Sequence, residues 1–139
     1  MTTQEIFEFL NSHPIFYLAT ADGDQARVRG IMLHKADEKG LVFTTAKYRD
    51  VYKQLITNPK VELCFHEQHL QIRVTGIAEE IDEDIELKKE IVAARDFMKP
   101  WIAKTGYEPM GLFRVTHCVA TTWTMTNTLA PKIFVNLTA

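Results

Sequence analysis

The alternation of apolar and polar residues predicts that most of this chain forms β-strands. Short apolar or alternating runs recur along the sequence, separated by turn residues such as Asp22-Gly23 and Lys39-Gly40. Strands joined by such tight turns pair in antiparallel fashion, because a parallel pair requires a long crossover. The pattern therefore predicts an antiparallel β-barrel of six or seven strands, which we place at residues 15–20, 25–34, 41–45, 60–66, 70–81, 112–125 and 133–137.

Apolar residues at helical spacing mark three further segments, which we expect to pack outside the barrel. The capping box Thr2–Glu5 begins the first helix. The second helix is predicted over 49–57, where an Asn-Pro pair follows and stops it. The third is predicted over 82–98, with Asp82 as its N-cap and Pro100 ending or bending it. The fold class is therefore mainly β with flanking helices.

Length and charge narrow the possible functions of the chain. Its 139 residues fit one domain, spanning 1–139, without a linker or an internal repeat. The net charge of -2 argues against general nucleic-acid binding, which depends on neutralising phosphates. We expect a cytoplasmic protein without a membrane span, because no basic-then-apolar signal and no long apolar run is present. Cys64 and Cys118 are predicted to be reduced thiols.

The motifs of common catalytic and metal sites are missing from the sequence. Five histidines are present, but only His66 and His69 lie close together, at a probable hairpin rather than on a helix. A zinc site requires three or four ligands on converging elements, so no metal site is expected. The sequence also lacks a G-x-S-x-G elbow, a P-loop and a G-x-G-x-x-G loop.

Basic residues and hydroxyls gather around one predicted strand pair and the helix that follows. Arg27 and Arg29 lie on one face of their strand, where the next residues are apolar. An inward arginine on an apolar face is costly unless an anion or a carboxylate meets it. The next strand ends in Thr44-Thr45-Ala46-Lys47 and leads into the 49–57 helix, whose N-terminal N–H groups favour anions. Lys53 could reach back, which would complete a phosphate site.

Surface ion pairing explains the same basic residues equally well. In that alternative, the four basic side chains pair with Glu38, Asp50 or Glu62; they are those of Arg27, Arg29, Lys47 and Lys53. For two further residues, a ligand-binding role and a structural role are equally compatible with the sequence. Gln71 could hydrogen-bond the edge of a heterocycle or merely lie on a solvated strand face. Trp123 could stack on an aromatic ligand or fill a dimer interface.

The order and spacing of three segments resemble those of a known family. The segments are Arg27-Val28-Arg29-Gly30-Ile31-Met32, the stretch from Asp37 to Val61, and Leu70-Gln71-Ile72-Arg73-Val74-Thr75-Gly76. Together they make the region from about Ile15 to Glu80 resemble the pyridoxamine 5'-phosphate oxidase-like family of FMN-binding split β-barrels, in particular its short, single-domain members. The resemblance implies an antiparallel split barrel that binds FMN at the interface of a homodimer.

The resemblance also implies roles for individual residues. Arg29 would bind the flavin phosphate, and Ile31-Met32 would run along the isoalloxazine ring. Thr45 and the start of the following helix would hold the phosphate and ribityl groups. Gln71 would lie near the ring, and Trp123 would come from the partner subunit. With the hydroxyl and lysines noted above, the predicted cofactor-binding residues are Arg29, Ile31, Met32, Thr44, Thr45, Lys47, Lys53, Gln71 and Trp123.

Two departures from the family's pattern bear on the activity. Arg49-Asp50-Val51 stands where the oxidases have Ser-Arg-Lys, so Lys47, Arg49 and Lys53 would have to supply the positive charge. The segment 124–131 lacks the arginine and histidine that hold substrate in the oxidases. Oxidation of pyridoxamine 5'-phosphate itself is therefore not expected.

Three hypotheses about function follow from the resemblance and its departures. The first is an FMN-dependent oxidoreductase or reductase that acts on an unknown small molecule, with the flavin supplying the redox chemistry. The second is a binding module for flavin, haem or deazaflavin without turnover of its own. The third is a structural dimer whose arginines form only salt bridges. No residue is assigned as catalytic, although His34, His66 and Tyr48 have the right chemical type.

Overall fold

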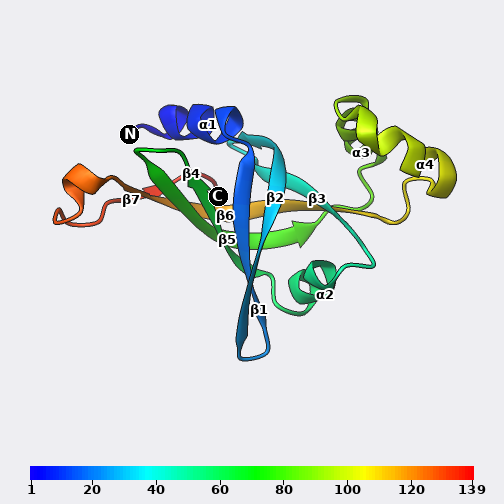
Figure 1. The fold of residues 1–139 in the computed structure, drawn as a ribbon, viewed down its shortest axis with the longest axis horizontal. Helices are drawn as coiled ribbons and strands as arrows, with labels where there is room; N and C mark the ends of the chain where they lie inside the picture. The colour runs from blue at the N-terminus through cyan, green and yellow to red at the C-terminus, as the bar shows by residue number, and fades with distance from the viewer.

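Alternating apolar residues and glycine-containing turns fold the chain into seven strands and four α-helices (Figure 1). The computed structural model describes residues 1–139. In chain order the elements are α1 (Thr3–Ser12), β1 (Ile15–Asp22), β2 (Gln25–Asp37), β3 (Gly40–Ala46), α2 (Asp50–Thr57), β4 (Lys60–His66), β5 (Gln71–Glu80), α3 (Ile85–Ala93), η1 (Asp96–Met98), α4 (Lys99–Thr105), β6 (Met110–Trp123), η2 (Met125–Asn127) and β7 (Phe134–Asn136).

Six strands close into an antiparallel barrel, as the sequence predicts. The strands follow the order β3-β2-β1-β4-β5-β6, and pairing of β3 with β6 closes the ring. β7 pairs with the far end of β6 and lies outside the barrel. The long strand β6 therefore has three partners, which are β3, β5 and β7.

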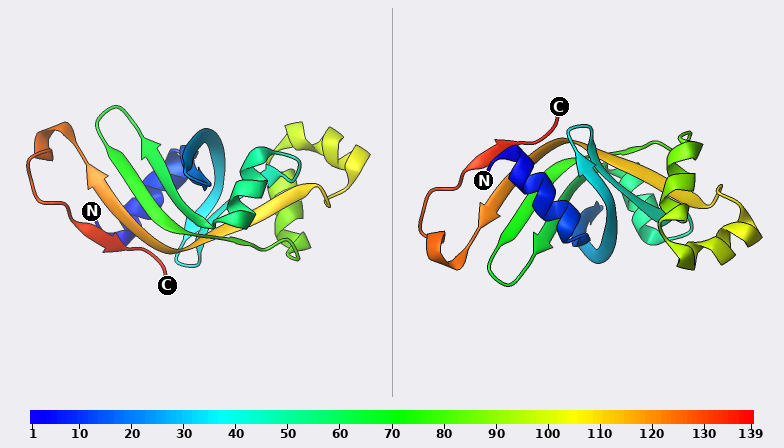
Figure 2. Two further views of the ribbon diagram at one scale, coloured as in Figure 1. Left: turned by 90° about the horizontal axis from the view of Figure 1, so that it is seen from below. Right: turned by 90° about the horizontal axis from the view of Figure 1, so that it is seen from above.

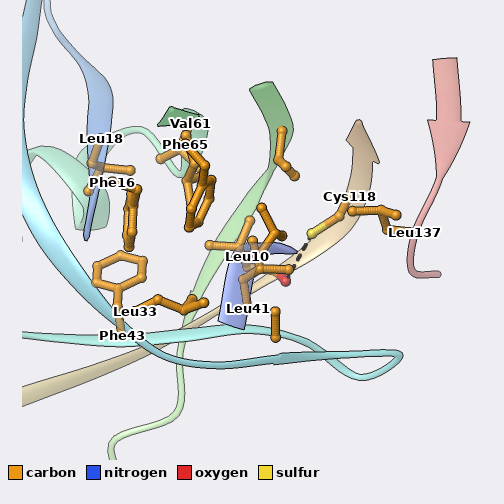
Figure 3. Close-up of a cluster of buried hydrophobic side chains, with 14 of the residues drawn as sticks. Leu10, Phe16, Leu18, Leu33, Leu41, Phe43, Val61, Phe65, Cys118 and Leu137 are labelled. Carbon is orange, nitrogen blue, oxygen red and sulfur yellow. Dashed lines mark hydrogen bonds between the residues drawn. The ribbon is translucent and has the colours of Figure 1, made fainter. Parts of the chain in front are cut away.

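Inward-facing residues of the strands form the main core (Figure 3). Phe16 and Phe65 stack with their ring centroids 4.9 Å apart, and Phe43 stacks on Phe113 at 5.7 Å. Helix α1 adds its apolar side chains to the same cluster. The Asn11 side chain fixes this helix to β2 through two 2.9 Å hydrogen bonds with the backbone of Ala36. None of the helices combines the length and apolar character that a membrane span requires.

Two glycines confirm the turn and the bulge that the sequence indicates. Gly23, with φ at 62°, makes the tight turn between β1 and β2. At Gly76 the register between β5 and β6 shifts, and an added Cβ would lie 2.5 Å from Val115 Cγ1. The close crossing of the two strands therefore requires glycine at position 76.

The predicted helix over 82–98 is wrong in its start and its length. Asp84, not Asp82, caps α3 by accepting a hydrogen bond from the backbone N–H of Leu87. The Asp82 carboxylate is instead engaged by two lysines, so it does not serve as a cap. The helix ends at Ala93, and Pro100 lies in the first turn of a separate helix, α4, where its missing N–H costs nothing.

Helices α3 and α4 lie together at one end of the molecule, away from α1 (Figure 2). Their apolar side chains form a second, smaller core with Val42, Met110 and Leu112 of the barrel. The two cysteines are unpaired, with Cys118 buried and Cys64 partly buried. Burial raises the pKa of both thiols, so neither is an activated nucleophile.

Candidate functional site

The Arg29 guanidinium lies at the inner face of β2, beside α2. Arg29 pairs with the fully buried Leu18, so both side chains point to the same side of the sheet. Its Nη1 donates to the Leu18 carbonyl at 3.1 Å and to Thr20 Oγ1 at 2.7 Å. Its Nη2 donates to Oε1 of Gln54, which also accepts from the Thr20 hydroxyl at 2.6 Å. Burial, with the nearby charge of Arg27, lowers the pKa of Arg29.

Arg29 is thus a half-buried cation held by neutral groups. No carboxylate forms an ion pair with it, although Asp50 is near enough to favour its charge. Arg27 does form a surface ion pair, but with Asp22 at 3.2 Å rather than with Glu38, Asp50 or Glu62, and both side chains are half-exposed. Arg29 therefore retains an uncompensated positive charge that an anion would stabilise.

The start of α2 and the end of β3 offer further anion-binding groups. Thr45 is buried, and its hydroxyl has no hydrogen-bond partner. No side chain caps α2, whose N-cap residue is Arg49. Free N–H groups at a helix N-terminus favour an anion. Thr44 precedes Thr45 on β3 and is partly buried, and Lys53 is exposed on α2 without an ion pair.

Lys47 is occupied elsewhere, in a cluster that ties α3 to the barrel. Its Nζ donates to the Asp82 carboxylate and lies 3.5 Å from Glu108. The hydrogen bond to Asp82 raises the pKa of Lys47. Lys88 of α3 lies 2.8 Å from Asp82 Oδ1, with only 2% of its side chain exposed. We call Lys47, Asp82 and Lys88 the Asp82 cluster. Lys47 would have to leave it to reach a ligand at α2.

The Asp82 carboxylate is strongly held as an anion. Burial alone would raise the pKa of Asp82, but its two lysine partners outweigh that effect and lower it. Beside the cluster, the Tyr52 hydroxyl donates to Glu80. This hydrogen bond raises the pKa of Tyr52 to about 12. Asp82 is therefore an anion and Tyr52 a neutral phenol at neutral pH.

Gln71 and Trp123 lie next to each other, far from Arg29. They are direct partners in the β5–β6 register, and Trp123 Nε1 donates to Thr128 Oγ1 at 3.0 Å. Strands β1 and β4 separate β2 from β5. Three strand spacings put Gln71 about 14 Å along the sheet from Met32. One copy of the chain therefore does not bring all predicted residues together.

A cavity of about 200 Å³ opens beside Gln71 and Trp123. Its lining residues are Gln71, Arg73, Thr121, Thr122, Trp123 and Lys132. Sequence patterning placed Arg73 on the same strand face as Gln71, because the two are separated by two positions. Lys132 had no such signal, since it precedes β7 and reaches the cavity only because that strand folds back on β6.

The outer face of β1 and β2 is apolar and exposed. Ile15 pairs with Met32 in the register, and Tyr17 and Val28 share this face. The exposed fractions are 54% for Ile15, 54% for Tyr17, 68% for Val28 and 39% for Met32. Ile31 faces the other way and packs against the core. A patch of this kind is typical of an interaction surface.

Another contact, absent from the sequence prediction, lies at the end of β2. His34 Nε2 is 2.8 Å from a carboxylate oxygen of Glu90 on α3. Arg95 donates to the carbonyl oxygen of Leu33 at 3.2 Å. No group of three or more His, Cys, Asp or Glu side chains is arranged to hold a metal ion.

Comparison with known proteins identifies the family. Residues 2–127 match the sequence profile of the pyridoxamine 5'-phosphate oxidase family. The chain belongs to this family. No curated protein matches the sequence. Among solved structures, a NimC/NimA family protein from Clostridium acetobutylicum is 26% identical with a TM-score of 0.77, and the match covers 96% of this chain and 93% of that one.

Two more distant structures share the fold. An FAD-binding protein from Mesorhizobium loti is 18% identical with a TM-score of 0.64, covering 89% of this chain and 96% of that one. The heme storage protein HutZ from Vibrio cholerae is 18% identical with a TM-score of 0.58, covering 81% and 87%. The split-barrel fold of this pyridoxamine 5'-phosphate oxidase family member is therefore shared by proteins with different ligands.

Proposed function

We propose that the protein binds FMN and acts as a flavin-dependent oxidoreductase on a small molecule in the cytoplasm. The observation that supports this most directly is Arg29, a half-buried cation without a carboxylate partner beside an uncapped helix. The unpartnered, buried hydroxyl of Thr45 adds a donor on the strand that leads into this helix. These groups suit the phosphate of a flavin mononucleotide.

The other half of the flavin site is proposed to come from a second copy of the chain. Within one copy, two strands separate Gln71 from the strand that carries Arg29. The exposed apolar face of Ile15, Tyr17, Val28 and Met32 offers a surface for pairing. In this homodimer, Trp123 of one copy is proposed to contact the cofactor held by the other.

FMN would supply the redox chemistry when bound, and the chain would supply binding, orientation and exclusion of water. Arg29 and the start of α2 would hold its phosphate. The β2 backbone at Ile31-Met32 would run along its ring. Trp123 of the second copy would contact the flavin, its indole held in place by Thr128.

The second candidate is a binding module that holds flavin or haem without turnover. The segment 124–131 favours it, because it contains neither an arginine nor a histidine to engage a substrate. The FAD-binding and heme storage proteins show that other members of this fold bind either kind of group.

Visible absorption of the purified protein, with and without added FMN, tests the proposal. We expect a protein-bound flavin spectrum and a dimer by size-exclusion chromatography. Reduction of the bound flavin by a pyridine nucleotide, followed by reoxidation with a test acceptor, distinguishes an oxidoreductase from a binding module. A protein whose absorption spectrum does not change when FMN is added would contradict the proposal. Binding of hemin instead of FMN would support the haem-binding module.

Lys53→Ala is expected to weaken FMN binding roughly twofold to fivefold, the effect of losing one exposed charge near a phosphate. Lys53 is exposed on α2 and makes no ion pair, so the fold should be unaffected. Fluorescence titration of FMN measures the change. Lys39→Ala, in the turn between β2 and β3, is the matched control and should bind FMN like the wild type. Equal affinity of the Lys53 variant would remove this lysine from the site.

A further inference from the structure

The cavity beside Trp123 is built by three segments that meet at one corner of the barrel. Gln71 and Arg73 come from the start of β5, and Thr121 to Trp123 come from the end of β6. Arg73 pairs with Thr121 in the register, two positions from the pair formed by Gln71 and Trp123. The chain then turns back through η2, so that Lys132 reaches the same cavity just before β7.

The cavity contains more positive charge than its surroundings neutralise. Arg73 forms one ion pair, with Glu62 at 3.4 Å, and both side chains are 40% exposed. It makes no hydrogen bond to another residue, and its Nε is buried without a partner. A guanidinium has five N–H donors, so most of the donors of Arg73 remain available. Lys132 has no carboxylate partner and adds a second cation.

Neutral groups complete the lining and favour a flat ligand. Trp123 is held by its hydrogen bond to Thr128, so its ring presents a fixed face. Thr121 Oγ1 is engaged with the carbonyl oxygen of Ile133 at 3.4 Å, which anchors the returning segment next to the cavity. Thr122 and Gln71 are partly buried and supply polar groups at its edge.

The cavity volume limits the size of the ligand. At about 200 Å³ it lies below the usual range of roughly 300–1,000 Å³ for cofactor and drug-sized ligands. A compound of one aromatic ring fits this volume, whereas a whole nucleotide would extend beyond it. A cationic pair beside an indole favours a planar ring that bears an anionic group.

We propose that this cavity binds a small aromatic carboxylate, with its carboxylate between Arg73 and Lys132 and its ring against Trp123. The assignment of that compound as the substrate rests on the proposed flavin function, because Gln71 and Trp123 belong to both. The flavin site itself does not require Arg73 or Lys132. The inference therefore names the chemical class of the molecule on which the bound flavin acts.

Quenching of Trp123 fluorescence by 4-nitrobenzoate tests the inference. Trp101 is the other tryptophan, exposed on α4, and Trp101→Phe leaves Trp123 as the sole indole reporter. We expect saturable quenching by 4-nitrobenzoate and at least tenfold weaker binding of neutral 4-nitrobenzamide, which has the same ring and nearly the same shape. The affinity for the carboxylate should also fall as ionic strength rises.

Two variants and a matched control test whether the cations that line the cavity bind the carboxylate. Lys132→Gln should raise the Kd for 4-nitrobenzoate about tenfold, which is typical of losing one charged hydrogen bond. Arg73→Lys keeps the ion pair with Glu62 possible but removes the planar fork, and it should raise the Kd severalfold. Lys104→Gln, on α4 and away from the cavity, should leave the Kd unchanged.

FMN binding is measured separately on the same proteins, so that the anion site in the cavity and the proposed flavin function are tested independently. Selective binding of the carboxylate, lost in Lys132→Gln, supports the anion site whether or not FMN binds. If FMN binds but the amide binds as well as the carboxylate, the inference is wrong and the flavin proposal stands. If the carboxylate binds selectively but FMN does not, the anion site stands and the proposed function fails.

Discussion

Asp82→Asn is expected to lower the melting temperature by about 10 °C. Lys88, whose side chain is only 2% exposed, would lose its counter-charge and remain buried as an uncompensated cation. Removing one partner of a buried ion pair costs roughly 3–5 kcal/mol, and the partial exposure of Asp82 places this case at about 3 kcal/mol. For a chain of this size, that corresponds to a shift of about 10 °C, measurable by circular dichroism or calorimetry.

Three further variants separate the charge from the side-chain volume. Lys88→Met should leave the melting temperature nearly unchanged, because an apolar side chain of similar size replaces the buried charge while Asp82 keeps Lys47. The double variant Asp82→Asn/Lys88→Met should recover most of the lost stability. Asp96→Asn removes an exposed carboxylate paired with Lys99 and should have almost no effect. A melting temperature for Asp82→Asn within 2 °C of wild type, roughly the shift for 0.5 kcal/mol, would contradict the account.

The same cluster predicts how stability depends on acid. The folded-state pKa of Asp82 is depressed, so its contribution is fully present above the unfolded value of about 3.9 and is lost as the pH falls through the lower folded value. Asp82→Asn should therefore flatten this part of the curve of unfolding free energy against pH. If the variant loses stability at low pH as steeply as the wild type, other carboxylates control acid unfolding.

Arg29→Lys is expected to weaken FMN binding roughly 10- to 100-fold. A hydrogen bond to a charged group contributes roughly 1.5–3 kcal/mol, which corresponds to about this range. Lysine keeps the charge but loses the planar fork that serves Thr20, Gln54 and a phosphate oxygen together. Arg29→Ala should bind FMN still more weakly. Flavin fluorescence titration measures both Kd values.

The neighbouring arginine provides the control for this experiment. Arg27→Ala removes a cation from the same strand face, but one already neutralised by Asp22 at the exposed end of the hairpin. It should change FMN affinity less than threefold, the effect expected of an exposed and already paired charge. Equal losses in the Arg27 and Arg29 variants would indicate a general electrostatic effect rather than a phosphate contact at Arg29.

Much of the fold follows from local patterns. Alternating residues such as Val61, Leu63 and Phe65 face the core, and Gly23 and Gly76 take the turn and bulge that their positions indicate. The helical region after β5 was harder to predict, because acidic residues are frequent there and any of them can cap a helix. Only tertiary contacts decide that Asp82 binds lysines while Asp84 caps α3.

In the candidate site too, local sequence patterns predict some side-chain positions, whereas others depend on contacts between distant parts of the chain. The inward position of Arg29 follows from strand periodicity, and the structure confirms it. The position of Lys47 does not follow, because its partner Asp82 is 35 positions away along the chain. Lys132 reaches its cavity only through the pairing of β6 with β7, and the apolar run at 133–137 predicts that strand but not its partner. Long-range pairing, rather than residue type, limits prediction here.

The three partners of β6 have a consequence for synthesis on the ribosome. Until residues 110–123 have emerged, β3 and β5 each lack a neighbour and present an unpaired edge. Exposed strand edges pair readily with other chains, so the nascent protein is prone to aggregate until β6 becomes available for pairing. Chaperones that shield the nascent chain would matter most in that interval.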